Sequence, residues 1–308
     1  MILVFGSLNV DITVPVENLP QVGETVLGQT YAMAPGGKGA NQALAARRAG
    51  AEVVFTGCTG KDGFADQAQA LLREAGVTVT CRQSNERPTA CALIIIDKNG
   101  RNQIAVASGA NMAAKSSDVP DTLLASGTII VLQMEVDASE NWALVARAKQ
   151  RGCRILLNVA PAGAVPSAIL PQVDWLVVNE GEAVAVAQHL EYKGEDPSAA
   201  GAYIFSKTGV TVIVTLGAAG ALAFGTGPTL CVNALDITPV DTTSAGDSFV
   251  GAFAAALDQG YDLAEAMRWG AAAGSLACLE IGAQTSVPER SQITARLNDV
   301  RVSQRAPA

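Results

Sequence analysis

Short apolar runs recur along the chain and are separated by longer stretches with helical periodicity. The runs are continuous rather than alternating, which is typical of strands covered on both faces. They are ILVF (2–5), VVF (53–55), IIVLQM (129–134), ILLNV (155–159), WLVV (175–178) and TVIVTL (211–216). Helices are expected between them, within 40–50, 65–76, 139–152 and 180–192. This alternation predicts an α/β fold with a doubly wound, mostly parallel sheet, whose ligands bind beyond the carboxyl ends of the strands.

Two segments, 11–34 and 89–107, interrupt this alternation and look like antiparallel ribbons. The second contains Asn99-Gly100 between strand-like runs, which predicts a hairpin turn. The two ribbons are expected to form a small β-sheet lid over the main sheet. Because we find no internal repeat, low-complexity tract or linker, we predict a single domain over 1–308 that carries this lid.

Composition narrows the class of protein. Of the 308 residues, 49% are hydrophobic and only 16% are charged, which argues against disorder. The formal net charge is −8 and lysines and arginines form no cluster, so nucleic acid is not an expected partner. No apolar run reaches the roughly 18 residues of a membrane span. The first residues, MILVFGSLNVD, look like a strand rather than a signal peptide.

The cysteines and the single histidine exclude several kinds of site. The six cysteines are scattered without a C-x-x-C pair, so we expect reduced, mostly buried thiols in a cytoplasmic protein. The only histidine, His189, lies in an expected helix, where a structural role is the usual one. A histidine-rich metal site is therefore excluded and a Ser-His-Asp triad is improbable.

The segment APGGKGANQ (34–42) places three glycines around Lys38 and then opens a helix. It is not a Walker A loop, because Gly39 stands where that motif needs Ser or Thr, and it is not a dinucleotide fingerprint, because Gln42 replaces the third glycine. Two interpretations remain. The segment is either a tight turn before a helix or a backbone that approaches a polar ligand, with Lys38 and Asn41 as hydrogen-bonding groups on one helix face.

Four further segments follow expected strands. Asp11 in GSLNVD and Glu135 in LQMEVD are either turn residues or carboxylates that bind sugar hydroxyls. In TLGAAG (215–220), Gly217 and Gly220 would allow a flat ligand to lie against the backbone. In NEGE, Asn179 and Glu182 form either a helix cap or a set of polar ligands for hydrated Mg²⁺ near phosphates.

The segment DTTSAGDSF (241–249) precedes an apolar helix. Ser244 and Asp247 fit the S-x-x-D pattern of a capping box. Alternatively, Asp247 is a catalytic base beside the free N–H groups of the first helical turn, which suit a phosphoryl group. The helix dipole is expected to lower the pKa of Asp247.

These segments together, in the order GSLNVD, GGKGANQ, NEGE, TLGAAG and DTTSAGD, resemble the ribokinase/PfkB family of carbohydrate kinases over nearly the whole chain. GGKGANQ and DTTSAGDSF match the two signature regions of the family. GGKGANQ, GAN (109–111) and IGAQTSVP (281–288) are similar in particular to the members that phosphorylate ribose. The resemblance implies an α/β fold with a β lid that transfers the γ-phosphoryl group of ATP to a sugar hydroxymethyl group, here converting D-ribose to ribose 5-phosphate.

The resemblance also implies roles for individual residues. The sugar would be held by Asp11, Gly37, Lys38, Asn41 and Glu135, with Asp247 accepting the proton of the attacking hydroxyl. The anion hole would consist of the N–H groups of Ala245, Gly246 and Asp247. Asn179 and Glu182 would organise Mg²⁺ and the phosphates, and Thr215, Gly217 and Gly220 would line the nucleotide site. A K⁺ activator would be bound by Asp241, Thr243, Ala277, Glu280, Gly282 and Ser286. A homodimer through the lid is also implied.

Three residues depart from the family pattern. Ser244 replaces a usual Gly or Ala, Val159 replaces a usual proline, and Ala219 replaces a longer polar residue.

A kinase of the same fold for another sugar or a nucleoside is the nearest alternative, because lid residues such as Ala92 set the pocket size. A sugar-binding sensor that has lost catalysis is a remote one. A nicotinamide oxidoreductase is excluded because no strand-to-helix G-x-G-x-x-G is present.

Overall fold

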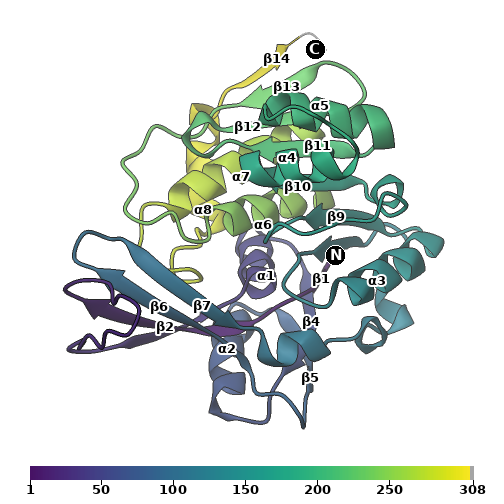
Figure 1. The fold of residues 1–308 in the computed structure, drawn as a ribbon. Helices are drawn as coiled ribbons and strands as arrows, with labels where there is room; N and C mark the ends of the chain where they lie inside the picture. Colours follow the sequence, from purple (N-terminus) through teal and green to yellow (C-terminus); the bar gives the residue numbers. More distant parts are fainter. Residues whose placement is uncertain (306–308) are drawn as a thin grey trace.

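The computed structural model describes residues 1–305, and within them the main sheet has ten strands in the order β14-β13-β12-β11-β10-β9-β8-β1-β4-β5 (Figure 1). The parallel strands are β1 (Ile2–Phe5), β4 (Val53–Thr59), β5 (Thr78–Gln83), β8 (Ile129–Leu132), β9 (Arg154–Asn158), β10 (Trp175–Asn179) and β11 (Thr211–Thr215). The antiparallel strands β12 (Ala221–Phe224), β13 (Thr229–Val232) and β14 (Val302–Arg305) complete one edge. The predicted fold class is confirmed, and all six predicted apolar runs lie in this sheet.

Helices cover both faces of the sheet because successive residues of each strand point to opposite sides. Ile2 and Val4 belong to one core, and Leu3 and Phe5 belong to the other. The first core is covered by α1 (Lys38–Arg48), α2 (Gly63–Glu74), α6 (Ala245–Asp258), α7 (Leu263–Ala277) and α8 (Arg290–Arg296). The second is covered by α3 (Ala138–Gln150), α4 (Glu180–His189) and α5 (Pro197–Thr208). The short 3₁₀ helices are η1 (Gly109–Ala113), η2 (Ser116–Asp118), η3 (Asp121–Leu123), η4 (Leu170–Gln172), η5 (Gly217–Ala219) and η6 (Leu297–Asp299).

A second, four-stranded sheet projects from the side of the molecule in the order β3-β2-β6-β7 (Figure 1). Its strands are β2 (Asn9–Val16), β3 (Ala32–Gly36), β6 (Ala90–Asp97) and β7 (Asn102–Ala107), so it uses the two segments that interrupt the α/β alternation. Each segment forms an antiparallel pair, and β2 and β6 join the pairs in parallel. Asp97 closes the predicted hairpin turn by accepting hydrogen bonds from the backbone N–H groups of Asn99 and Arg101.

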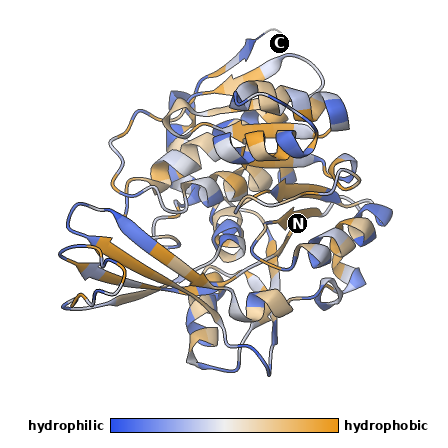
Figure 2. Cartoon of the chain, viewed as in Figure 1, coloured by the Kyte–Doolittle hydropathy of each residue, from blue (hydrophilic) through white to orange (hydrophobic). Residues whose placement is uncertain are grey.

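Hydrophobic residues run along the strands of both sheets, and hydrophilic residues mark the outer helix faces and the tips of the second sheet (Figure 2). Among residues 1–305, no helix combines the length and the apolar character that crossing a membrane requires. All six cysteines are free thiols and four of them are buried, as expected. His189 lies on an exposed helix face, where its Nδ1 contacts the carbonyl oxygen of Ala185 at 2.7 Å.

Candidate active site

Asp247 lies in the first turn of α6, but it does not cap that helix. Ser244 occupies the N-cap position with φ 62° and makes no capping hydrogen bond through its side chain. Instead, the carboxylate of Asp247 accepts hydrogen bonds from two side chains of α1, with Asn41 Nδ2 at 2.9 Å from Oδ2 and Gln42 Nε2 at 2.9 Å from Oδ1. The capping interpretation of S-x-x-D is therefore wrong for this helix, because a tertiary contact takes the carboxylate.

Helices α1 and α6 pack closely enough for these contacts because Gly251, one turn beyond Asp247, has no side chain. A Cβ at Gly251 would lie 2.5 Å from the backbone oxygen of Gln42 and 2.5 Å from Cβ of Ala45. Both distances are far inside van der Waals contact, so a larger residue would push the two helices apart. The glycine thus positions the base as well as packing the core.

The electrostatic setting of Asp247 suits a base. Burial raises the pKa of its carboxyl, while the charge of Lys38 and the two amide donors oppose that rise. The prediction of a lowered pKa is wrong, because desolvation outweighs the favourable field of the helix start. A raised pKa brings a carboxylate closer to the operating pH and strengthens it as a proton acceptor.

Two further carboxylates and Lys38 surround this group. Ser7 Oγ donates to Glu135 Oε2 at 2.6 Å, and the Lys38 backbone N–H donates to the same oxygen at 3.0 Å. Burial, followed by the charges of Glu135 and Asp247, raises the pKa of Asp11 to about 6. The charge of Asp247 is the largest influence on Lys38 and raises the pKa of its ammonium group. Three carboxylates and one ammonium group therefore lie close enough to influence one another, and such a group of charges can bind the hydroxyls of a polyol.

The loop that carries Lys38 is shaped by Gly37, the N-cap residue of α1, which has φ 92°. A Cβ at this position would lie 2.7 Å from Cα of Leu8, so the loop must pass closely over the chain that leaves β1. The Ala40 N–H donates to the backbone oxygen of Ser7 at 2.9 Å and holds the two segments together. This packing brings Lys38 next to Glu135, although they are 97 residues apart in sequence.

In the part of the chain that the structure describes, the first turn of α6 has N–H groups without backbone acceptors. Within residues 1–305, the N–H groups of Gly246 and Asp247 have no backbone acceptor, and a Cβ built on Gly246 would meet nothing within 4 Å. The Ala245 N–H differs, because it donates to the Thr242 carbonyl at 3.3 Å. Two unengaged N–H groups, with a third in a long hydrogen bond, can bind an anion at this helix start.

Asn179 and Glu182 form a complete capping box at the start of α4. Asn179 Oδ1 accepts from the Glu182 N–H, and Glu182 Oε2 accepts from the Asn179 N–H, both at 2.8 Å. Glu182 is buried, which raises the pKa of its carboxyl, and it also feels the charges of Lys38 and Asp247. The cap prediction is confirmed, and the same carboxylate faces the charged cluster.

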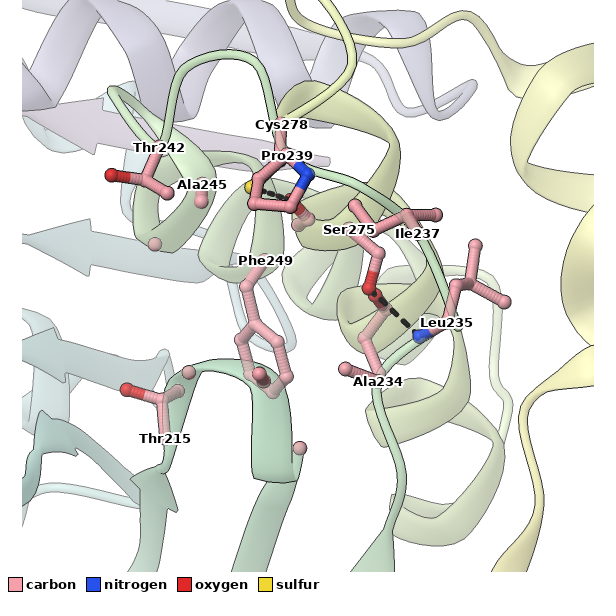
Figure 3. A pocket seen from close by; sticks show the side chains of 16 residues that line it. Thr215, Ala234, Leu235, Ile237, Pro239, Thr242, Ala245, Phe249, Ser275 and Cys278 are labelled. Carbon is pink, nitrogen blue, oxygen red and sulfur yellow. Dashed lines mark hydrogen bonds between the residues drawn. The ribbon is translucent and has the colours of Figure 1, made fainter.

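A largely apolar cavity of about 250 Å³ opens on the other side of the α6 start. Figure 3 shows its lining, which brings together the predicted residues Thr215, Ala245 and the neighbouring glycines with the side of α7. Gly217 faces open space, whereas a Cβ at Gly220 would lie 1.9 Å from the backbone oxygen of Val232, so Gly220 is needed by the fold itself. Of the residues predicted to bind the nucleotide, Thr215, Gly217, Gly220 and Gly246 line the cavity and Asn179 does not, while Ala245, predicted for the anion hole, lines it as well.

The sequence interpretation missed most of this cavity. One wall is the segment after β13, where the Leu235 N–H donates to Ser275 Oγ of α7 at 3.0 Å (Figure 3). Phe249 forms another part of the wall, and its apolar helical spacing indicates only a core residue. The residues that were not predicted are Ala218, Ala234, Leu235, Ile237, Pro239, Thr242, Phe249, Ala271, Gly274, Ser275 and Cys278. Small and apolar side chains without a motif carry no signal for a ligand.

A second loop cluster lies beside the α6 start. Asp241 Oδ1 accepts from the N–H and the Oγ1 of Thr243 at 2.9 and 2.6 Å, and its Oδ2 accepts from the Gly282 N–H at 2.9 Å. Burial disfavours the charged carboxyl of Asp241, but these hydrogen bonds outweigh it and lower its pKa. Ser286 Oγ donates to the Gly282 carbonyl at 2.6 Å. Ala277 ends α7 and Glu280 lies in the exposed turn that follows.

Comparison with known proteins identifies the family. The model of the pfkB family carbohydrate kinases matches residues 1–290. The chain belongs to the pfkB family of carbohydrate kinases. The curated relatives include the ribokinase of Haemophilus influenzae, 34% identical over 296 residues that cover 94% of this chain and 95% of the relative. The ribokinase of Lactococcus lactis is 32% identical and covers 97% of this chain and 98% of its own length.

Solved structures agree with this family assignment. The ribokinase of Thermotoga maritima matches with a TM-score of 0.89 and 31% identity, covering 96% of this chain and 99% of that one. The Arabidopsis thaliana ribokinase, solved as a complex with ribose and ATP, matches with a TM-score of 0.86 and 32% identity, with coverage of 96% and 98%. The two-sheet architecture is therefore that of ribokinases.

The structure locates the three departures from the pfkB pattern. Val159 is fully buried in the second core, and its N–H donates to the Val177 carbonyl at 3.1 Å, so it serves packing. Ala219 is exposed in η5, between residues that line the cavity. Ser244 takes the left-handed conformation that favours glycine, and its buried Oγ has no hydrogen-bond partner within residues 1–305.

Proposed function

We propose that this enzyme transfers the γ-phosphoryl group of ATP to the hydroxymethyl group of D-ribose and produces ribose 5-phosphate. The observation that carries the proposal is the position of Asp247. Its carboxylate faces the polar cluster of Asp11, Lys38 and Glu135, and the residues just before it line the apolar cavity. A polyol and a nucleotide bound on the two sides would meet at the start of α6. The relatives named as ribokinases, and the Arabidopsis complex with ribose and ATP, support ribose as the acceptor.

In this proposal Asp247 accepts the proton of the attacking hydroxyl. Asp11, Lys38, Asn41, Glu135 and the backbone of Gly37 hold the sugar, and their fixed positions supply the orientation on which phosphoryl transfer mainly depends. The N–H groups of Gly246 and Asp247, with Ala245 as a weaker third, stabilise the charge on the transferred group. Asn179, Thr215, Gly217 and Gly220 contact the nucleotide.

The residues present fit a hydrated Mg²⁺ that is bound mainly through ATP. Mg²⁺ in kinases uses one or two carboxylates, several waters and substrate phosphates rather than a protein cage. Glu182 supplies a buried carboxylate near Lys38 and Asp247, which suits a contact through water. When bound, the ion would neutralise charge on the phosphates, while Asn179 and Glu182 hold its water shell in place.

The cluster around Asp241 fits a monovalent cation. Hydrogen bonds lower the pKa of the Asp241 carboxyl, which favours its anionic form, and one of them joins the loop of Asp241 to the loop of Gly282. K⁺ bound by backbone oxygens of this cluster, with Thr243, Ala277, Glu280 and Ser286 in the same loops, would add positive charge beside the anion-binding helix start. Activity should therefore rise with K⁺.

The lid is proposed to pair two subunits. Its edge strand β7 is exposed throughout, and Ile104 and Val106 are 55% and 53% exposed. An exposed apolar edge strand is a template for pairing with a second chain. A homodimer should appear in sedimentation experiments and be weakened by Ile104→Asp.

A cytoplasmic location is proposed as well, since all six cysteines are free thiols.

ADP release from MgATP over a panel of sugars and nucleosides, with and without K⁺, tests the function. Fastest turnover with D-ribose, raised by K⁺, is the expected result. Faster turnover with another sugar or a nucleoside would keep the mechanism and change the substrate. Sugar binding without turnover across the panel would contradict the kinase assignment and favour a sensor.

A further inference from the structure

Behind the base lies a chain of buried amide side chains that the proposed mechanism leaves unassigned. Gln42 is fully buried and donates through Nε2 to Asp247 Oδ1 at 2.9 Å and to Asn158 Oδ1 at 3.0 Å. Its Oε1 accepts from Gln133 Nε2 at 2.8 Å. Gln42 therefore uses both N–H groups of its amide and its oxygen, and it connects the base on α6 to the centre of the sheet.

A backbone carbonyl sets the orientation of the Asn158 amide and, through it, that of Gln42. Asn158 Nδ2 donates to the Val177 carbonyl of β10 at 3.1 Å. Because a carbonyl only accepts, the oxygen of Asn158 must turn toward Gln42, and Gln42 must then present N–H groups to both Asn158 and Asp247. A reversed amide of Gln42 would place its oxygen against two acceptors. The chain thus delivers a donor, and never an acceptor, to Asp247 Oδ1.

We propose that Gln42 is a positioning residue that fixes the rotation of the Asp247 carboxylate and favours its ionised form as the base. With Asn41 on Oδ2 and Gln42 on Oδ1, each oxygen receives one N–H group and keeps a lone pair for the sugar hydroxyl. Donors to a carboxylate stabilise the charged form and so oppose the effect of burial. This inference rests on the proposed role of Asp247.

Other charged groups also act on Asp247 and must stay constant in the test. Lys38 of α1 favours the ionised form, and Glu135 after β8 opposes it. Glu182 of α4 and Asp11 of β2 are coupled to the same carboxylate. Gln42 is neutral, so replacing it with Met, which has similar length, removes the donor without changing the charge near the site.

The test compares the pH profiles of kcat for wild type, Gln42→Met and Gln42→Glu. Loss of a hydrogen bond to a charged group should lower kcat of Gln42→Met about 10- to 100-fold at pH 7. The pKa of Asp247 should rise, so the acidic limb of kcat should move up by about one pH unit. Gln42→Glu should shift the limb further, because two carboxyls would then share a proton. The sugar KM should change little, since Gln42 is 0% exposed.

A matched control is Gln69→Met in α2. Gln69 is also a buried glutamine, but it donates to the Ala65 carbonyl of its own helix. This variant should lose stability and keep the pH profile of wild type. Equal losses of kcat in the Gln42 and Gln69 variants without a pH shift would overturn the inference, because both would then report stability alone.

Asp247→Asn tests the proposed base separately from the role of Gln42. An inactive Asp247→Asn beside a Gln42→Met with the kcat and pH profile of wild type would overturn the role of Gln42 and leave the proposed base intact. Substantial activity in Asp247→Asn would overturn both. If Gln42→Met does not fold, Gln133→Met leaves Gln42 in place but removes one restraint on its amide. A smaller shift of the acidic limb in the same direction would support the inference, and a wild-type profile would overturn it.

Discussion

The starts of α4 and α6 have nearly the same polar pattern and opposite structures. Asn179 and Glu182 exchange two hydrogen bonds and close a capping box. Ser244 and Asp247 have the same spacing, but Ser244 adopts φ 62° and Asp247 turns to Asn41 and Gln42 of α1. The pattern describes what the first turn of a helix can do alone. Whether the first turn is capped in this way depends on the neighbouring helix, which at α6 offers two amide donors to Asp247.

The polar residues at the start of α4 serve stability, whereas those at the start of α6 serve the proposed catalysis. At α4 the polar residues satisfy N–H groups of their own helix, so their loss should weaken the fold. At α6 those N–H groups stay unengaged at Gly246 and Asp247, and the carboxylate is buried against another helix. An unsatisfied helix start beside a buried charge is unfavourable for folding, and such an arrangement is expected at a site that binds an anion.

Replacing the base should have the largest effect. Asp247→Asn should lower kcat by about 10²- to 10⁴-fold, the range for loss of a general base, while the affinity for ATP changes little. ADP release and an ATP titration measure the two quantities. Circular dichroism shows whether the variant is folded, and near-normal kcat in a folded variant would contradict the base assignment.

Removing the cap of α4 should produce the next largest effect. Asn179→Ala should lower the free energy of unfolding by about 1 kcal/mol, as for other N-caps. Ser244→Ala is the matched substitution at α6 and should change it by less than about 0.5 kcal/mol, because no capping hydrogen bond is lost. Urea unfolding of both variants gives the comparison. Equal losses would indicate that Ser244 caps α6 in solution.

Ser244→Gly should change stability in the opposite direction. Glycine removes a left-handed strain of about 1–2 kcal/mol but adds about 0.5–1 kcal/mol of entropy to the unfolded chain. We therefore expect a net gain of roughly 0.5 kcal/mol. A shift of the urea midpoint to higher concentration at constant slope would confirm it, and a lower midpoint would show that the Ser244 hydroxyl makes a stabilising contact.

Asp11 extends the comparison to the polar side of the α6 start, where stability should depend on pH. Its pKa is raised from 3.8 to about 6, so the folded state binds more protons than the unfolded chain in this range. The contribution of Asp11 to stability should therefore fall as pH rises from 4 to 6 and stay low above it. Asp11→Asn should be more stable than wild type at neutral pH, and this difference should shrink on acidification. Urea unfolding at several pH values measures it, and a constant difference would contradict the raised pKa.

Much of the fold followed from local patterns. Continuous apolar runs predicted buried parallel strands, and the two interrupting segments form the strands of the second sheet. Strands β5, β13 and β14 were not predicted, because they lie at the two opposite edges of the sheet, where the exposed Thr78 and the half-buried Thr229 weaken the apolar signal. Motifs with charged residues predicted Asp11, Lys38, Glu135 and Asp247 as site residues. In the structure these four side chains lie close enough for their charges to influence one another.

The sequence by itself determined the alternation of strands and helices, the family and the residue types that chemistry requires. Only the tertiary structure decided which helix start is capped, because Asn41 and Asp247 are 206 residues apart and no local pattern encodes their contact. It also formed the apolar cavity from the segment after β13 and the side of α7, whose small side chains carry no motif. Hydrogen bonds within one helical turn depend on spacing alone, whereas contacts between helices depend on how closely their backbones pack, here at Gly251.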